Sequence, residues 1–216
     1  MKTGKKLLIS FVLIIVVITL FIIGLILYKD RTYFYTPTYK NKTNNATDIL
    51  VVYYSRSGNT EAMAKEIARK FQADIQNIKT EKYTLDFNGQ LEAGRDSDLE
   101  TLPLITPAVV DLREYRLVFL GAPIWWYRPA TPLWSFVENN DFTDKKVILF
   151  NTFNSRFKPE MIEQFRNKIE QKGGQMIDHI YVRRGRVLYQ KDGDEVVDET
   201  RELLTEVVGK WAALFE

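Results

Sequence analysis

The sequence predicts an α/β protein in which a parallel sheet is packed between two layers of helices. The chain holds three fully apolar runs, at residues 49–54, 117–121 and 147–150, each too short for a helix and rich in β-branched or aromatic residues. A loop and a segment with helical spacing follow each run. Strands separated by helices pair in parallel through right-handed crossovers, which gives a three-layer α/β/α sandwich.

The composition limits the chemistry that this chain can perform. Hydrophobic residues make up 45% and charged residues 27% of the 216 residues, as is typical of a globular protein. There is no cysteine and one histidine. The first fact excludes disulfides, thiolate metal sites, iron–sulfur clusters and phosphatases with a cysteine nucleophile. The second argues against a metal centre built from imidazoles, so we expect no metal.

The net charge does not indicate a nucleic-acid partner. The formal charge is +2, but Lys2, Lys5 and Lys6 precede an uncharged apolar run at residues 7–28. Without these lysines the rest of the chain carries about −1. The remaining Lys and Arg residues are scattered, as on a solvated surface, and we expect no nucleic-acid binding.

Residues 7–28 predict a transmembrane anchor behind a basic tail at residues 1–6. As a helix the run would extend roughly 33 Å, which is enough to cross a bilayer core. No small-residue cleavage site follows it, so we interpret it as uncleaved; a cleaved signal or a buried core helix is the alternative. Positive charges on its two sides are nearly balanced, and the positive-inside rule leaves the orientation open.

The rest of the chain divides into a linker and one domain. Residues 29–47 mix Tyr, Thr, Pro, Asn and Lys without periodicity, which is typical of a linker. Residues 48–216 have the size of one α/β domain.

The domain alternates predicted strands and helices. The first strand, 49–54, leads into a helix at 60–72 with one apolar face. Residues 74–80 predict a peripheral strand, and 81–106 form a long polar excursion without regular structure. A short helix is possible at 106–115. The later elements are strands at 117–121, 146–151 and 175–182 and helices at 131–139, 159–172 and 198–215.

Three loops leave the carboxyl ends of apolar strands, where open α/β sheets bind ligands. The first, 55–60, carries hydroxyl side chains and one glycine directly before a helix. Free N–H groups and the helix dipole make such a place an anion site. The loop lacks the lysine of a Walker A motif and the three glycines of a dinucleotide fingerprint. Taken alone, it is equally compatible with an ordinary N-capped turn.

The second loop carries a cluster of large aromatic side chains. Trp125, Trp126 and Tyr127 follow a core strand, and a soluble protein seldom exposes such a patch without a ligand or partner. Flat aromatic side chains suit a planar ring by offset stacking. We expect one of the two tryptophans to pack instead under the helix that starts near Thr131.

At these two loops the chain resembles the flavodoxin family. Residues 54–61, Tyr-Ser-Arg-Ser-Gly-Asn-Thr-Glu, are similar to the flavodoxin phosphate loop. Residues 121–126, Gly-Ala-Pro-Ile-Trp-Trp, are similar to the flavin-ring loop of a subfamily often exported or tethered in bacteria. The resemblance covers roughly residues 48–215.

This resemblance implies a five-stranded parallel sheet of order 2-1-3-4-5 and one non-covalent FMN. The phosphate would lie in the first loop and the isoalloxazine ring between the second and third loops. The cofactor-binding residues that it implies are Ser55, Arg56, Ser57, Gly58, Asn59, Thr60, Pro123, Ile124, Trp125, Trp126, Tyr127, Thr152, Phe153 and Asn154.

The chain departs from the family in both ring loops. Tyr127-Arg128 stands where a glycine usually follows the tryptophan pair, and residues 151–157 replace a glycine-rich third loop. Bulky residues there could narrow the ring site; alternatively, Arg128 or Arg156 could bring positive charge near the flavin and raise its potential. On the long excursion, Asp86, Arg95 and Asp96 could border the cavity, although a solvated loop is the simpler interpretation.

We expect a membrane-anchored FMN protein that either carries electrons or reduces a small acceptor such as a quinone, as an NAD(P)H/quinone-type oxidoreductase. The cofactor performs the redox chemistry, so no catalytic side chain is required. Its partner would be a redox protein or a small-molecule acceptor. The exported members of the subfamily favour a domain outside the cytoplasm. The alternative is a flavodoxin-shaped module that binds a partner or another phosphate ligand without turnover.

Overall fold

The computed structural model describes residues 2–40, 47–186 and 189–214. The chain divides into two compact units, Met1–Thr32 and Tyr33–Glu216. The first unit consists of helix α1, Lys2–Arg31. Within it, Gly4–Leu25 is long and apolar enough to cross a membrane, judged by length and composition. The predicted anchor, residues 7–28, lies inside this helix.

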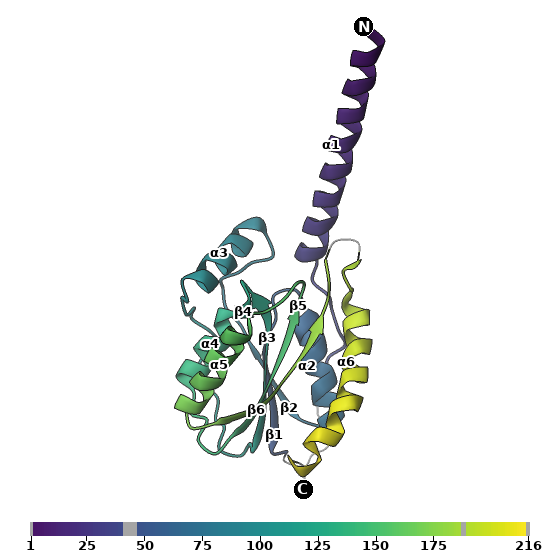
Figure 1. Cartoon of the computed structure of the whole chain (residues 1–216). Coiled ribbons are helices and arrows are strands. Elements are labelled where there is room, and N and C mark those ends of the chain that lie inside the picture. The colour runs from purple at the N-terminus through teal and green to yellow at the C-terminus, as the bar shows by residue number, and fades with distance from the viewer. Residues whose placement is uncertain (1, 41–46, 187–188, 215–216) are drawn as a thin grey trace. The chain divides into compact units, whose positions relative to one another are not determined.

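The second unit is a three-layer α/β/α sandwich (Figure 1). Five parallel strands are arranged in the order β2-β1-β3-β5-β6, and the two-residue strand β4 pairs with β3 alone. Counted without β4, this is the predicted order 2-1-3-4-5. The strands are β1 (Ile49–Tyr54), β2 (Asp74–Ile78), β3 (Leu117–Trp125), β4 (Arg128–Pro129), β5 (Lys146–Phe153) and β6 (Gln175–Arg183).

Helices cover both faces of the sheet. Figure 1 shows α2 and α6 on one face, α4 and α5 on the other, and α3 beside the β4 end of the sheet. The helices are α2 (Asn59–Phe71), α3 (Phe87–Asp98), α4 (Thr131–Asn139), α5 (Pro159–Gln171), α6 (Gly193–Val207) and the 3₁₀ helix η2 (Val208–Leu214).

The sheet has a hydrophobic core on each face because successive side chains of a strand point to opposite sides. From β1, Leu50, Val52 and Tyr54 join the cluster that includes residues of α4 and α5. Val51 and Tyr53 join the cluster that includes residues of α2 and α6. All six residues of β1 are buried, as expected of a parallel strand covered on both sides.

The excursion at residues 81–106 was wrongly predicted to lack regular structure, because α3 lies within it. Two glycines, Gly89 and Gly94, weaken its helical sequence pattern. The helix is fixed instead by Asp86, which caps it by accepting a hydrogen bond from the Gly89 N–H at 2.8 Å.

Two other predicted helices also differ from the structure. No helix forms at residues 106–115, where the chain is fully described and irregular. The last helix begins at Gly193 instead of residue 198, because Asp192 and Glu195 form a capping box. Its predicted end, Phe215, lies outside the described residues.

Part of the predicted linker, residues 33–40, packs against the sandwich. Tyr39 places its hydroxyl 3.0 Å from the carbonyl oxygen of Ala68 near the end of α2. The Lys65 ammonium on α2 donates to the carbonyl oxygen of Thr36 at 3.1 Å. Residues 41–46 of the linker lie outside the described residues. We call residues 33–40 the strap.

Candidate functional site

The predicted anion site is the loop between β1 and α2. β1 ends at Tyr54 and α2 begins at Asn59, so parallel pairing places this loop at the carboxyl edge of the sheet. Gly58 is the N-cap residue of α2, with a φ of 86° and no side-chain cap. This left-handed conformation favours glycine. The first N–H groups of α2 have no helical acceptor and are directed at the loop.

Two serine hydroxyls in this loop accept hydrogen bonds from neighbouring groups of the loop and of α2. The Gly58 N–H donates to Ser55 Oγ at 3.1 Å, and Asn59 Nδ2 donates to Ser57 Oγ at 3.0 Å. Because each oxygen already accepts a bond, each O–H remains available as a donor. Hydroxyl and amide donors at a helix N-terminus fit an anion such as a phosphate.

Asn59 adds a buried acceptor beside these donors. Its side chain is 5% exposed, and its Oδ1 has no hydrogen-bond partner among the residues that the structure describes. A buried acceptor that lacks a partner costs free energy, so a hydroxyl from a ligand would stabilise it. The site therefore suits a ligand that carries both a phosphate and hydroxyl groups.

Thr60 connects this loop to the third predicted loop. Its Oγ1 lies 2.7 Å from Thr152 Oγ1 in the interior. Thr152 and Phe153 are the last residues of β5 rather than loop residues. Phe153 is buried and packs edge-on against Phe157, with ring centroids 5.5 Å apart. Its ring therefore belongs to the core.

The side chain of Arg56 extends from the loop between β1 and α2 and holds the turn before α3. Its Nη2 donates to the carbonyl oxygen of Thr84 at 2.8 Å and to that of Asp86 at 3.2 Å. These hydrogen bonds to backbone carbonyls fix the direction of the Arg56 guanidinium. Arg56 thus positions α3 relative to the loop.

The second predicted loop is a tight β-hairpin between β3 and β4. Trp125 pairs with Arg128 across it, and the two turn residues, Trp126 and Tyr127, have φ values of 44° and 71°. Positive φ at both positions defines a type I′ turn, in which glycine and asparagine are favoured. The absence of a glycine here is therefore a source of backbone strain.

The two tryptophans face different surroundings. Trp125 is half-buried and packs edge-on against Tyr54 and Tyr83, at centroid distances of 5.5 and 5.0 Å. Trp126 is 57% exposed. The far edge of its ring lies over Gly94 of α3, where a Cβ atom would come within 2.6 Å. Trp126 thus offers open aromatic surface at the carboxyl edge.

Tyr127 is covered by cationic residues of the third loop. The Arg156 guanidinium and the Lys158 ammonium each lie 5.3 Å from the centroid of its ring. The Lys158 N–H also donates to the Tyr127 carbonyl oxygen at 2.9 Å. These contacts stabilise the strained turn and join the second loop to the third.

Arg128 does not bring a free positive charge to the ring loops. It is 5% exposed, its Nη1 lies 2.6 Å from Glu100 Oε1, and its guanidinium stacks 4.6 Å from the centroid of Trp134. Pairing in β4 directs this side chain toward the end of α3 and toward α4. Its role is structural, and its charge is neutralised by Glu100.

The remaining predicted border residues hold α3 in place. Asp86 caps the helix, and Asp96 is buried and accepts from Tyr83 Oη at 2.8 Å and from Lys82 Nζ at 3.1 Å. Burial opposes the ionisation of Asp96, but these hydrogen bonds outweigh it and lower its pKa. Arg95 is exposed and 3.4 Å from Asp96.

A buried network beneath the loops was missed by sequence reasoning. Asn151, fully buried, donates from Nδ2 to the Ala122 carbonyl oxygen at 2.7 Å. Its Oδ1 lies 2.8 Å from His179 Nε2. Since Oδ1 can only accept, His179 carries its proton on Nε2. Burial lowers the pKa of His179 to about 4, so the ring is neutral near pH 7. The sequence did offer one signal for this network, which is the polar residue Asn151 within the mostly apolar strand β5.

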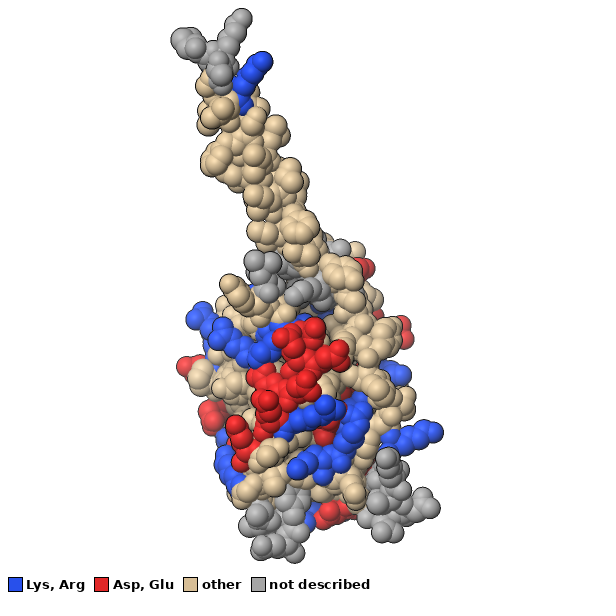
Figure 2. All heavy atoms as spheres, turned by 90° about the vertical axis from the view of Figure 1, so that its right-hand side faces the viewer, with Lys and Arg blue, Asp and Glu red and all other residues tan. Residues whose placement is uncertain are grey.

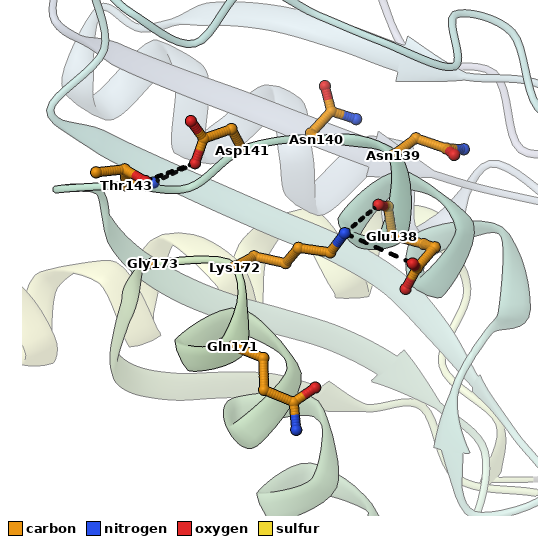
Figure 3. Close-up of a pocket in the computed structure, with 8 residues that line it drawn as sticks. All are labelled: Glu138, Asn139, Asn140, Asp141, Thr143, Gln171, Lys172 and Gly173. Atoms are coloured by element: carbon orange, nitrogen blue, oxygen red, sulfur yellow. Dashed lines mark hydrogen bonds and ion pairs between the residues drawn. The ribbon is translucent and has the colours of Figure 1, made fainter.

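Two other surfaces lie away from these loops. Figure 3 shows a shallow pocket at the ends of α4 and α5, opposite the carboxyl edge, where Lys172 Nζ lies 3.5 Å from Glu138 Oε1. Lys172 also donates to the Glu138 carbonyl oxygen at 2.5 Å, which stabilises the end of α4.

Figure 2 shows acidic side chains gathered on the face of α2 and α6, with Lys and Arg beside them. Arg201, 3.0 Å from Glu66, pairs these two helices. Among the described residues, no cluster of His, Cys, Asp or Glu could hold a metal ion.

Comparisons with known proteins agree with the fold described above. The closely similar folds include a flavoprotein from Lactobacillus acidophilus, solved in complex with FMN, at 23% identity and a TM-score of 0.54, covering 63% of this chain and 93% of that chain. A candidate flavoprotein from Bacteroides uniformis has 22% identity and a TM-score of 0.54, covering 71% and 97%. One from Bacteroides eggerthii has 22% identity and a TM-score of 0.53, covering 74% and 97%. At these identities the likeness establishes the fold.

No curated protein sequence matches the chain. Residues 48–193, however, match the family model described as flavodoxin. This match spans most of the second unit, from β1 to the start of α6. The chain therefore belongs to the flavodoxin family.

Proposed function

We propose that this chain binds one FMN at the carboxyl edge of its sheet and transfers electrons. The observation that carries the proposal is the pair of serine hydroxyls, Ser55 and Ser57, at the N-terminus of α2, whose oxygens accept from Gly58 and Asn59 and whose protons can be donated to an anion. FMN carries the phosphate and the ribityl hydroxyls that these donors and Asn59 Oδ1 would bind. The bound flavin would supply reversible transfer of one or two electrons.

The chain's own residues would bind and orient the cofactor. Ser55, Ser57 and the first N–H groups of α2 would hold the phosphate. Trp126 would offer its exposed ring for stacking, and the backbone at residues 124–126 and 152–154 would border the ring's polar edge. The neighbouring Arg156–Tyr127 contact would limit access of water to that side.

We further propose that α1 anchors the chain in a membrane as a single span. Its apolar stretch supports this proposal, and the exported members of the resembling subfamily favour a domain outside the cytoplasm. Protease treatment of intact cells would digest the domain in that orientation and spare it in the other.

The electron acceptor is proposed to be a redox protein or a small molecule such as a quinone. An anchored domain would meet lipid-soluble acceptors at the bilayer surface. Whether the protein is a carrier or a reductase would be decided by steady-state assays with NAD(P)H and a soluble quinone.

The cofactor proposal is tested on the full chain purified in detergent. We expect yellow protein with flavin absorbance, or uptake of added FMN, followed by bleaching on reduction with dithionite. A folded protein, judged by circular dichroism, that neither contains nor takes up FMN would leave the alternative of a flavodoxin-shaped module for another phosphate ligand. The strained turn at Trp126 and Tyr127, where the family usually has a glycine, is the observation that favours that alternative.

A further inference from the structure

The strap passes directly beside the phosphate loop. The Phe34 N–H donates to the Ser57 carbonyl oxygen at 2.9 Å. The Phe34 carbonyl oxygen lies so close to Gly58 that a Cβ atom there would come within 2.0 Å of it. On the other side, the Phe34 ring lies against Gly193 at the start of α6, where a Cβ atom would come within 2.1 Å. Phe34 is thus held between the phosphate loop and α6.

This contact fixes the direction of a donor in the phosphate loop. In a trans peptide the C=O of Ser57 and the N–H of Gly58 point in opposite directions. The bond from Phe34 to the Ser57 carbonyl therefore turns the Gly58 N–H away from the strap, where it donates to Ser55 Oγ at 3.1 Å. Because Ser55 Oγ accepts that bond, its own proton is free for an anion.

Tyr33, the strap residue next to Phe34, contacts an acidic side chain close to this loop. Glu61 lies in the first turn of α2, where its carboxylate competes with an anionic ligand for the helix dipole. Tyr33 Oη donates to this carboxylate, and Lys65 Nζ lies 2.6 Å from it. Burial and Glu61 raise the pKa of Tyr33, so its hydroxyl remains a donor.

We propose that the strap is part of the phosphate-binding machinery, with Phe34 as a positioning residue for Ser55 and Tyr33 as a hydrogen-bond donor that holds the Glu61 carboxylate beside Lys65. The inference rests on the proposed binding of FMN. It adds that a segment outside the α/β sandwich sets the affinity for the phosphate end of the cofactor and not for the ring end.

The test compares FMN with riboflavin, which has the same ring and ribityl chain but no phosphate. The first variant of the full chain in detergent is Gly193→Ala, which drives a methyl group into the Phe34 ring without placing alanine at a positive φ. Gly209→Ala is the matched control, because nothing lies within 4 Å of its added Cβ atom.

We expect Gly193→Ala to weaken FMN binding by about tenfold, as for one charge-assisted hydrogen bond, while riboflavin affinity stays within about twofold. Gly209→Ala should match the wild type for both ligands. A second variant, Tyr33→Phe, removes only the hydroxyl at Glu61 and should weaken FMN by a smaller factor, again without affecting riboflavin.

Three results separate the possibilities. Equal losses for FMN and riboflavin, or unchanged FMN affinity in both variants, would overturn the inference while the proposed function stands. If Gly193→Ala does not fold, Tyr33→Phe decides alone. A wild-type protein that binds no FMN would overturn the proposed function, and with it the role of the strap.

Discussion

The hydroxyls of Thr60 and Thr152 share a buried hydrogen bond of 2.7 Å. Thr60 belongs to the first turn of α2 and Thr152 to the end of β5, so this bond ties the start of α2 to the carboxyl end of β5. Two segments that are far apart in the sequence are thereby held next to each other.

Replacing either threonine by valine should destabilise the fold by about 1–3 kcal/mol, because the other hydroxyl is left buried without its partner. The double variant Thr60→Val/Thr152→Val should cost less than the sum of the two single variants. Urea unfolding of all four proteins measures this coupling. Additive losses would mean that the two hydroxyls do not interact.

The turn at Tyr127 predicts an unusual preference for glycine. Its φ of 71° is easily adopted by glycine and costly for other residues. Tyr127→Gly should therefore be more stable than Tyr127→Ala by about 1 kcal/mol. At the exposed helical position Glu202 the same pair should show the opposite order, with glycine about 1 kcal/mol less stable. Thermal or urea unfolding gives both differences, and the same order at both positions would contradict a left-handed turn.

Gly94 predicts a change at the ring end of the site. A methyl group there would come within 2.6 Å of Trp126 and displace its exposed ring. If that ring stacks on the flavin, Gly94→Ala should weaken FMN and riboflavin by the same factor, roughly 3–10-fold. Fluorescence titration with both flavins checks the result. A loss confined to FMN would place Gly94 at the phosphate end instead.

His179 predicts a pH dependence of stability. Its pKa is about 4 in the folded chain because of burial, below the ordinary value of 6.5. Between these values the unfolded chain binds a proton that the folded chain does not, so stability falls as the pH is lowered from about 6.5 to about 4. The loss should reach up to roughly 3 kcal/mol. Carboxyl groups whose pKa is lowered in the folded chain, such as Glu138, Asp96 and Asp178, add their own loss of stability at the acidic end of this window.

The control for this titration is His179→Gln, which keeps a side-chain donor for Asn151 but does not titrate. Urea unfolding at several pH values should give a flatter profile between pH 6.5 and 4 for this variant than for the wild type. Identical slopes would show that another group causes the dependence.

The sequence predicted the layers and the loops at the carboxyl edge, because these depend on local patterns, whereas the strand order was implied by the resemblance to the flavodoxin family. An apolar run, a glycine before a helix and a tryptophan pair can each be recognised within a few residues. The strand β4 and the helix α3 were missed because both depend on partners distant in the sequence. Arg56, for example, holds the turn at Thr84 before α3.

The directions of the side chains in the site could not be predicted from the sequence either. Arg128 was considered as a charge near the flavin, but its pairing in β4 turns it to Glu100 and Trp134. The strap was interpreted as a linker, since its contact with Gly58 is made by the backbone of Phe34. Any residue type can make a backbone contact, so the sequence does not reveal it.

The most direct test of the central claim is FMN titration of the double variant Ser55→Ala/Ser57→Ala, in the full chain and beside the wild type. Ser97→Ala is the matched control, because the buried Ser97 hydroxyl has no hydrogen-bond partner among the described residues. The phosphate-loop assignment predicts that the double variant binds FMN at least about a hundredfold more weakly, with riboflavin affinity and the control unchanged. Unchanged FMN affinity in the double variant would contradict it.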